Sequence, residues 1–246
     1  MKRSLLVTVL SACAIMLLSS YCRAEERQGE IKTRTELSYV ETSGNTDTKT
    51  FSVNLEVKKE GVTNRYFLTS KALYAKEDGR ETSNKLSVDG RWERVLSNGL
   101  FGLLTSGFSM DKFSGYEYRI YGGPGLGYDV IKTDRHILQS LVSLIYSYDE
   151  FSVGDVSSDS YITGKATVNY EWRILENLKF KEKLDYSVSF KDTDNFFIDS
   201  ATSIEAKINR ALSLGLSYVV NYQNLLPSPE IQHTDTTFLT TLIIDF

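Results

Sequence analysis

The sequence predicts an all-β protein: one antiparallel, up-and-down transmembrane β-barrel of about twelve strands, preceded by a cleaved signal peptide. Three observations predict this fold. The chain opens with a secretory leader, apolar and polar residues alternate almost to the last residue, and the alternating segments are long enough to cross a bilayer. Between these segments tight turns alternate with longer loops, which is typical of bacterial outer-membrane barrels.

Residues 1–24 have the layout of a secretory signal peptide. Lys2 and Arg3 precede the uncharged apolar run Leu5–Leu18, and small residues lead to a cleavage site after Ala24. The apolar run has about 14 residues, whereas a membrane-spanning helix needs about 20. We therefore expect a barrel domain over residues 25–246, located in the outer membrane of a Gram-negative bacterium.

The predicted cleavage also limits the chemistry of the mature chain. Both cysteines, Cys13 and Cys22, fall within the signal, which excludes disulfides and Cys-ligated metals. A lipoprotein acylated at Cys13 is disfavoured because apolar residues continue after it. The signal contains three of the 28 basic residues and none of the 32 acidic ones, so the mature chain has a net charge of −7. That charge is not typical of a nucleic-acid-binding protein, and no nucleic-acid partner is expected.

Twelve alternating segments follow the signal, and their length favours a membrane barrel over a soluble sandwich. A globular strand has about 5–6 residues, whereas a tilted membrane strand needs about 9–11 in the hydrocarbon alone. The clearest segments place apolar residues on one face and polar residues on the other, with Glu182 as the one charge on the apolar face of its segment. The predicted strands are Ile31–Thr42, Asp47–Lys59, Thr63–Lys76, Asn84–Val95, Leu100–Asp111, Tyr116–Ile131, His136–Asp149, Tyr161–Ile174, Leu178–Lys191, Phe197–Asn209, Leu212–Asn224 and Asp235–Phe246.

The connections predict which rim faces the periplasm. Short turns are expected on the periplasmic side, and an even strand count places both termini there. In the predicted sixth strand Gly122, Gly123 and Pro124 interrupt the pattern, and because proline lacks an amide donor we expect a bulge or edge irregularity. The short turns are 60–61, 97–99, 133–134, 176–177 and 210–211, and the opposite loops are 43–46, 77–83, 112–115, 150–160, 192–195 and 225–234.

Aromatic residues gather near the strand ends, where two girdles would meet the membrane–water boundaries. Ordinary core aromatics, the alternative, would lie in mid-strand. Phe246 ends the chain on an alternating strand, which resembles the signal read by the outer-membrane assembly machinery. That machinery, outer-membrane lipids and lipopolysaccharide are the expected partners. The predicted turn-side girdle is Trp92, Phe101, Tyr128, Trp172, Phe180 and Phe246, and the loop-side girdle is Tyr39, Tyr74, Phe108, Tyr118, Tyr148, Tyr186, Tyr222 and Phe238.

Charged residues fall on the face opposite the apolar one, and we expect them to line a polar lumen. A Lys or Arg facing lipid at mid-membrane would cost about 2–4 kcal/mol, so these charges must point inward. The predicted lumen-lining residues are Arg34, Glu36, Lys85, Asp89, Arg91, Glu117, Arg119, Lys179, Lys181, Lys183 and Asp185, together with Glu56, Lys58, Lys71, Glu93, Lys165, Glu171, Glu205 and Lys207.

Two stretches resemble a known family. Residues 36–49 read ELSYVETSGNTDTK, and residues 111–119 read DKFSGYEYR and run on to GLGY at 125–128 and TDR at 133–135. These motifs are similar to those of the salt-induced outer-membrane proteins, the YdiY-like proteins of domain of unknown function 481. The resemblance covers the mature chain and implies an outer-membrane barrel. It implies no catalytic residues and no ligand.

Catalytic and metal-binding residues are scarce. A lipid-modifying barrel enzyme would need His233 with Ser228 and Asp235, but three nearby residue types make no triad without geometry. No pair of histidines has metal-ligand spacing, and the loop Asp192–Asn195 is more simply a solvated loop than a calcium site. We expect no enzyme activity, no cofactor and no metal.

The sequence therefore favours a narrow channel for small polar or ionic solutes, with a role in salt or osmotic stress as the resemblance implies. Lys179, Lys181 and Lys183 stand two apart on one face and predict a mild anion preference. A structural envelope barrel without transport is the first alternative, and a lipid-modifying enzyme is the second.

Overall fold

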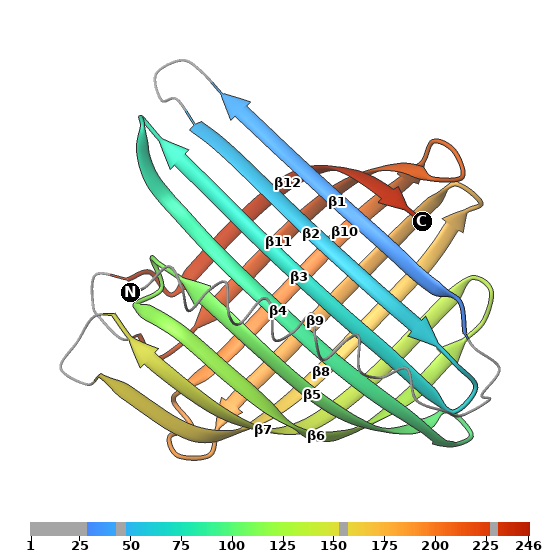
Figure 1. The fold of residues 1–246 in the computed structure, drawn as a ribbon, viewed down its shortest axis with the longest axis horizontal. Helices are drawn as coiled ribbons and strands as arrows, with labels where there is room; N and C mark the ends of the chain where they lie inside the picture. Colours follow the sequence, from blue (N-terminus) through green and yellow to red (C-terminus); the bar gives the residue numbers. More distant parts are fainter. Residues whose placement is uncertain (1–28, 43–47, 153–156, 227–230) are drawn as a thin grey trace.

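The fold is a closed barrel of twelve antiparallel strands in chain order, with β1 beside β12. The computed structural model describes residues 29–42, 48–152, 157–226 and 231–246, and the predicted signal peptide, residues 1–24, lies outside them (Figure 1). The strands are β1 (Ile31–Thr42), β2 (Thr48–Glu60), β3 (Asn64–Glu77), β4 (Arg80–Ser97), β5 (Leu100–Asp111), β6 (Tyr116–Lys132), β7 (His136–Phe151), β8 (Ser158–Leu175), β9 (Leu178–Ser189), β10 (Phe196–Lys207), β11 (Leu212–Gln223) and β12 (Thr234–Asp245). The predicted fold class is confirmed, and every predicted strand is present.

Side chains alternate between the inside and the outside of the barrel, with apolar residues prominent on the outside. On β7, Leu141 and Ile145 are buried whereas Val142, Leu144 and Tyr146 are more than half exposed. A bilayer would cover such an outer face, because a closed barrel satisfies its backbone groups between strands and leaves apolar side chains for lipid. No helix in the described part of the chain is long and apolar enough to span a membrane.

The β3–β4 connection is shorter than expected. The predicted loop 77–83 is instead a two-residue turn at Asp78 and Gly79, whose φ angles are 47° and 76°. Asp-Gly and Asn-Gly pairs accept positive φ at both central positions, which favours tight hairpin turns. The same geometry recurs at Asn98 and Gly99 on the opposite rim, as predicted.

The irregularity expected at Pro124 takes a different form. The β6–β7 pairing is interrupted at Gly123 and Pro124, but the register is the same on both sides, so there is no bulge here. The register shifts of β6 lie near its two ends, between Tyr116 and Tyr118 and between Asp129 and Ile131. At Gly123 an added Cβ would lie 1.9 Å from the carbonyl oxygen of Leu144, so the close approach of β7 requires glycine.

Phe101 corrects the predicted turn-side girdle. Its side chain is fully buried inside the barrel, in an apolar cluster with Leu103 and Leu141, whereas its neighbours Leu100 and Leu104 are exposed. Gly127 of β6 lies opposite Phe101, and an added Cβ at Gly127 would lie 2.2 Å from the Phe101 ring, so this glycine leaves the space that the inward ring occupies. The predicted girdle residues Trp92, Tyr128, Trp172, Phe238 and Phe246 are exposed, and Phe180, Tyr118 and Tyr148 are partly exposed.

Glu182 lies on the outer face of β9, as its position in the alternation predicts. Its carboxylate accepts hydrogen bonds from the hydroxyls of Ser200 at 2.9 Å and Thr202 at 2.6 Å, both on the neighbouring strand β10. These bonds within the sheet reduce the cost of a carboxylate on an apolar surface.

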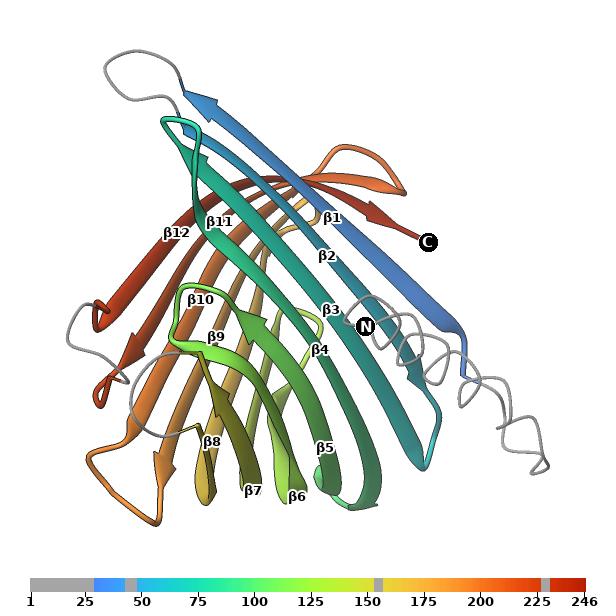
Figure 2. The same cartoon turned by 60° about the vertical axis from the view of Figure 1, so that its left-hand side comes forward.

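The seam that closes the barrel is incomplete. β1 pairs with β2 over its whole length, but β12 pairs with β1 only between Thr241–Asp245 and Arg34–Ser38 in the described chain. Two further backbone hydrogen bonds join Thr33 and Phe246 at the turn-side end. Figures 1 and 2 show the two strands running together near the C-terminus and diverging towards the loop side.

Candidate functional site: charged clusters inside the barrel

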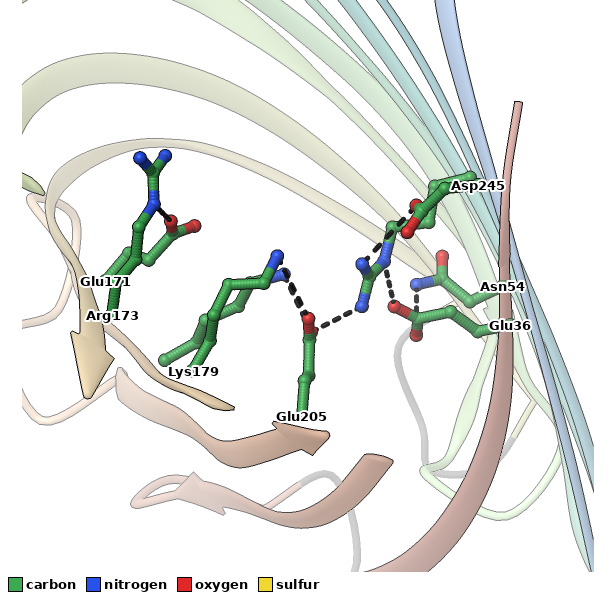
Figure 3. Close-up of polar contacts among 9 residues, drawn as sticks. Glu36, Asn54, Glu171, Arg173, Lys179, Glu205 and Asp245 are labelled. Atoms are coloured by element: carbon green, nitrogen blue, oxygen red, sulfur yellow. Dashed lines mark hydrogen bonds and ion pairs between the residues drawn. The ribbon is translucent and has the colours of Figure 1, made fainter. Parts of the chain in front are cut away.

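The first cluster lies at the turn side and is centred on Glu205 of β10, so we call it the Glu205 cluster. Lys181 of β9 lies 2.7 Å from the Glu205 carboxylate, Lys179 lies 3.6 Å from it, and the Arg34 guanidinium of β1 also binds it. Figure 3 shows the Glu205 side chain between Lys179 on one side and Glu36 with Asp245 on the other, inside the curve of the sheet. One buried carboxylate thus forms ion pairs with three cations.

The β1 side of the Glu205 cluster adds further carboxylates. Arg34 Nε donates to Glu36 at 2.7 Å, and Arg34 also lies 3.5 Å from Asp245 of β12. Asn54 of β2 donates to the second oxygen of Glu36 at 3.0 Å (Figure 3). The cluster is therefore a chain of shared ion pairs that joins β9, β10, β12, β1 and β2.

A second turn-side cluster occupies β3, β4 and β6. Arg65 lies 2.8 Å from Glu93 and 3.4 Å from Asp129, and Arg91 lies 2.9 Å from the other oxygen of Glu93. The Arg65 guanidinium stacks 4.5 Å above the ring of Phe101. Since Glu93 has no exposed surface, its two arginine partners offset the cost of burying its charge.

A third group lies nearer mid-strand on β8 and β9. The Asp185 carboxylate lies 3.1 Å from Lys165 and 3.2 Å from Lys183, and it accepts a hydrogen bond from Thr167 at 2.5 Å. Here again one carboxylate is shared by two lysines, so this wall has more cations than anions in direct contact.

The loop-side cluster differs in composition and is centred on Arg119 of β6. Arg119 donates to both oxygens of Asp149, at 2.6 and 3.0 Å, and the hydroxyl of Tyr161 donates to the same carboxylate at 2.8 Å. The guanidinium also lies 4.3 Å from the ring of Tyr116 and 4.9 Å from that of Phe197. This is a one-to-one, bidentate pair enclosed by aromatic rings.

Two loop-side contacts join strands that are not neighbours in the sheet. Gln223 of β11 donates to the hydroxyl of Tyr116 on β6 at 2.7 Å. Lys85 of β4 lies 2.9 Å from Asp111 of β5 and 3.0 Å from Asp235 of β12. β4 and β12 are separated by three strands, so the second contact passes across the interior.

The remaining predicted lumen residues are placed as follows. Asp89 accepts a hydrogen bond from Tyr121 of β6, and Glu171 pairs with Arg173 at 3.0 Å (Figure 3). Glu117 is exposed beside the register shift of β6 and is not part of the clusters. Lys58, Lys71 and Lys207 are exposed, and Glu56 is partly exposed. The structure thus brings together Arg34, Glu36, Lys179, Lys181 and Glu205 in one cluster and Arg91 with Glu93 in another.

Several important residues were missed from the sequence. Arg65 shares a face with Lys71, so strict alternation along β3 would have found it. Asp149 and Asp129 lie near strand ends, where charges are common in loops and alternation is a weak signal. The tyrosines 116, 121 and 161 count as apolar residues in the alternation because of their rings. All three hydroxyls nevertheless form polar contacts inside the barrel.

The structure does not bring His233 and Asp235 together as a catalytic triad would require, because both residues have other partners. The ring of His233 bonds the carbonyl oxygen of Gln223 at 2.8 Å, while Asp235 binds Lys85, and Ser228 lies outside the described residues. The ring of His136 bonds the hydroxyl of Tyr170 at 2.9 Å. In the loop Asp192–Asn195, the Asp192 carboxylate accepts the amide of Asp194 and so closes a turn. Among the described residues there is no group of three or more potential metal ligands.

Comparisons of the sequence with known proteins find similarity along most of the chain. A family model described as "Protein of unknown function, DUF481" matches residues 35–246. The uncharacterized protein YdiY of Escherichia coli (strain K12) is 23% identical over 197 residues, which cover 80% of this chain and 76% of the relative.

Two solved structures, of an outer membrane channel and of a porin, are similar to this chain over most of its length. An outer membrane channel from Pseudomonas putida F1 has a TM-score of 0.50 at 8% identity and covers 92% of this chain and 98% of its own. The NanC porin has a TM-score of 0.49 at 11% identity and covers 88% and 98%. At such low identity, the likeness to the Pseudomonas channel shows a common barrel fold.

Proposed function

This chain belongs to the DUF481 family, and from that premise we propose that it is an outer-membrane barrel whose charged interior passes small polar or ionic solutes. The barrel would stand with its short turns in the periplasm and its loops outside the cell. The proposal rests on the polar interior and the apolar outer face together.

The observation that carries the proposal is the sharing of carboxylates by several cations. Glu205 serves Arg34, Lys179 and Lys181, and Asp185 serves Lys165 and Lys183. Arg34 has Glu36 and Asp245 as further partners, but among the described residues each of the four lysines shares one carboxylate with another cation. The charge of each lysine is therefore incompletely neutralised, and a passing anion can replace the carboxylate at low cost. The interior wall of β8, β9, β10 and β1 therefore supports a mild preference for anions.

Single-channel recording in planar bilayers tests the proposal. We expect discrete current steps and, under a salt gradient, a reversal potential that indicates anion preference. Replacing Lys179, Lys181 and Lys183 together by Gln should move the reversal potential towards cation preference. The matched control is Lys132→Gln, because the Lys132 side chain is 73% exposed at the end of β6. Absence of current at every voltage from correctly folded protein would exclude a channel.

A structural envelope barrel is the second candidate, and the loop-side cluster favours it. The contact of Arg119 with Phe197 joins β6 to β10, and that of Tyr116 with Gln223 joins β6 to β11, so both would stiffen the barrel. A barrel that resists osmotic deformation needs such contacts but needs no continuous water path. The same recordings distinguish the two candidates, because only the channel conducts.

Insertion of the barrel is proposed to depend on Phe246. This residue is 77% exposed, and its backbone exchanges two hydrogen bonds with Thr33 at the seam. An exposed aromatic ring at the end of the last strand is available for recognition by the assembly machinery before the barrel closes. Deleting Phe246 should reduce the amount of protein recovered in outer-membrane fractions, while Phe246→Tyr should not.

A further inference from the structure

We propose that the loop-side mouth of the barrel is a gate, which is closed in this structure by two contacts across the lumen. In the first contact Gln223 binds Tyr116, and in the second Lys85 binds Asp235. We call these the gate contacts. The inference rests on the proposed channel, because only a barrel that conducts can open and close. In a structural barrel the same contacts would stay formed.

The gate contacts cross the interior. Gln223 of β11 donates to the Tyr116 hydroxyl of β6 at 2.7 Å, and the shorter way between these strands round the barrel passes β7, β8, β9 and β10. Lys85 of β4 lies 3.0 Å from Asp235 of β12, with β1, β2 and β3 between them. Strands this far apart in a closed barrel face each other across the lumen. Side chains that touch between them therefore narrow the path of a solute.

The two gate contacts join the same two walls. Lys85 also binds Asp111 of β5 at 2.9 Å, and Asp111 lies opposite the gate tyrosine in the β5–β6 ladder. On the other wall, Asp235 pairs with β11 at Asn221, two residues before Gln223. β4, β5 and β6 are thus held to β11 and β12 by neighbouring contacts, so the two contacts would close the mouth together.

The interior beside the gate contacts is closely packed. Tyr116 and Tyr161 have hydroxyls with partners inside the barrel and are only 8% and 6% exposed. The Arg119 guanidinium contacts the rings of Tyr116 and of Phe197 on β10. Nearer mid-strand on β9, the Lys183 side chain is 50% exposed. The lumen is therefore more closed at the loop side than beside the lysines.

The backbone around Tyr116 is suited to movement. Both ladders of β6 shift register beside this residue, the β5–β6 ladder after Ser109 and the β6–β7 ladder before Tyr118. The β6–β7 ladder is interrupted again at Gly123 and Pro124. Because irregular pairing lets a strand bend, the loop-side end of β6 can move away from β11 without breaking a regular ladder.

Each gate contact can be broken without leaving a buried charge unpaired. The bond between the Gln223 amide and the tyrosine hydroxyl is neutral, and Gln223 keeps the carbonyl oxygen of Leu225 as an acceptor. Lys85 keeps Asp111, and the released Asp235 is 58% exposed. A neutral hydrogen bond and a partly exposed ion pair each contribute little net stability, so the closed and open states can interconvert. The bidentate pair of Arg119 joins neighbouring strands and stays formed in both states.

Removing the gate contacts should open the mouth. In planar bilayers, we expect brief openings from the wild type and openings about tenfold longer from the double variant Gln223→Ala, Asp235→Asn, because two weak contacts of the closed state are lost. The matched control is the double variant Asn221→Ala, Asp199→Asn. These two side chains also face the interior, but they bind each other between neighbouring strands at 2.7 Å. The control should therefore gate like the wild type.

A covalent link tests whether closure takes place between β6 and β11. Once the predicted signal is removed the chain has no cysteine, so Tyr116→Cys with Gln223→Cys would supply the only two thiols. This variant should conduct in long openings, close when a bis-maleimide reagent with an internal disulfide joins the thiols, and reopen when that disulfide is reduced. Asp199→Cys with Asn221→Cys, treated in the same way, should keep its conductance.

The recordings separate the gate from the proposed function. Equal open times in the wild type and the Gln223→Ala, Asp235→Asn variant, or a current that cross-linking does not reduce, would overturn the gate and retain the channel. Control variants that respond as strongly as the gate variants would also overturn it, because the effect would not be specific to contacts across the lumen. Absence of current from every variant would reject both the gate and the channel.

Discussion

At the turn side, Glu205 is shared by Arg34, Lys179 and Lys181, whereas at the loop side Arg119 binds both oxygens of Asp149. Both sites place charges inside the same barrel, but they differ in how completely each charge is neutralised. The loop-side pair is bidentate and is flanked by aromatic rings, so a change of partner would require breaking several contacts at once. The shared carboxylate allows its cations to exchange partners. The interior therefore combines a rigid end with an adaptable one.

The largest expected effect is that of Arg119→Ala. This change leaves Asp149, whose side chain is 1% exposed, without its cation, and breaking such a buried pair costs about 3–5 kcal/mol. The midpoint of urea unfolding in detergent, followed by the fluorescence of Trp92 and Trp172, should fall markedly. Arg173→Ala is the control, because that side chain is 49% exposed and surface pairs contribute about 0–1 kcal/mol. Equal shifts for both variants would remove the proposed difference in rigidity.

The second largest loss of stability is expected at Phe101, because the turn-side cluster of Arg65 and Glu93 is packed on this ring and is more rigid than the Glu205 cluster. Phe101→Leu removes a fully buried ring that lies under the Arg65 guanidinium, and we expect a loss of about 1–2 kcal/mol. Unfolding midpoints measure this loss. Leu100→Ala, on the exposed face of β5, should change stability less, and the reverse order would contradict the inward placement of Phe101.

Glu205→Gln should change selectivity more than stability. The Arg34 guanidinium keeps Glu36 and Asp245 as partners, while Lys179 and Lys181 lose their carboxylate and become free to attract anions. The reversal potential in a salt gradient should move towards anions, with an unfolding midpoint shifted less than in Arg119→Ala. A large loss of stability without a change in selectivity would show that the Glu205 cluster is also a rigid support.

The smallest change in stability is expected for a substitution on the outer face of the barrel, at Glu182 of β9. Glu182→Leu removes a carboxylate from the apolar face together with its bonds from Ser200 and Thr202, and these opposing terms should leave stability within about 1 kcal/mol. Ile204→Glu on the outer face of β10, opposite Phe180 and Leu216, introduces a charge without such hydroxyl partners and should be more destabilising. If Glu182→Leu proves as harmful as Arg119→Ala, the outer carboxylate has a partner in the membrane.

The strands were predictable because period-two alternation depends directly on which side chains face lipid. β1 and β5 have the predicted bounds, and the other strands differ by a few residues at their ends. The wrong predictions concern positions at which the alternation along a single strand does not determine the structure. Asp78 and Gly79 form a tight turn that alternation cannot reveal, and the inward ring of Phe101 depends on the space left by Gly127 of the neighbouring strand β6.

The candidate site was predictable only in part. The inward charges of β9 follow from spacing alone, but their partners do not, because Glu205 meets Arg34 through the closure of the barrel. The contacts of Arg119 with Phe197 and of Tyr116 with Gln223 join residues far apart in sequence. Such contacts depend on the strand number and tilt of the whole barrel, which no short segment encodes.

The short ladder between Arg34–Ser38 and Thr241–Asp245 also bears on how the molecule folds. It joins the two ends of the chain and therefore has the greatest sequence separation of any strand pair, so the entropy of closing it is lost last. Folding should accordingly proceed through a nearly complete sheet whose final step is the zippering of Thr33 with Phe246 upward to Ser38. The amides of this ladder should exchange with solvent deuterium earlier than those between β6 and β7, which makes the last pairing to form the first to open.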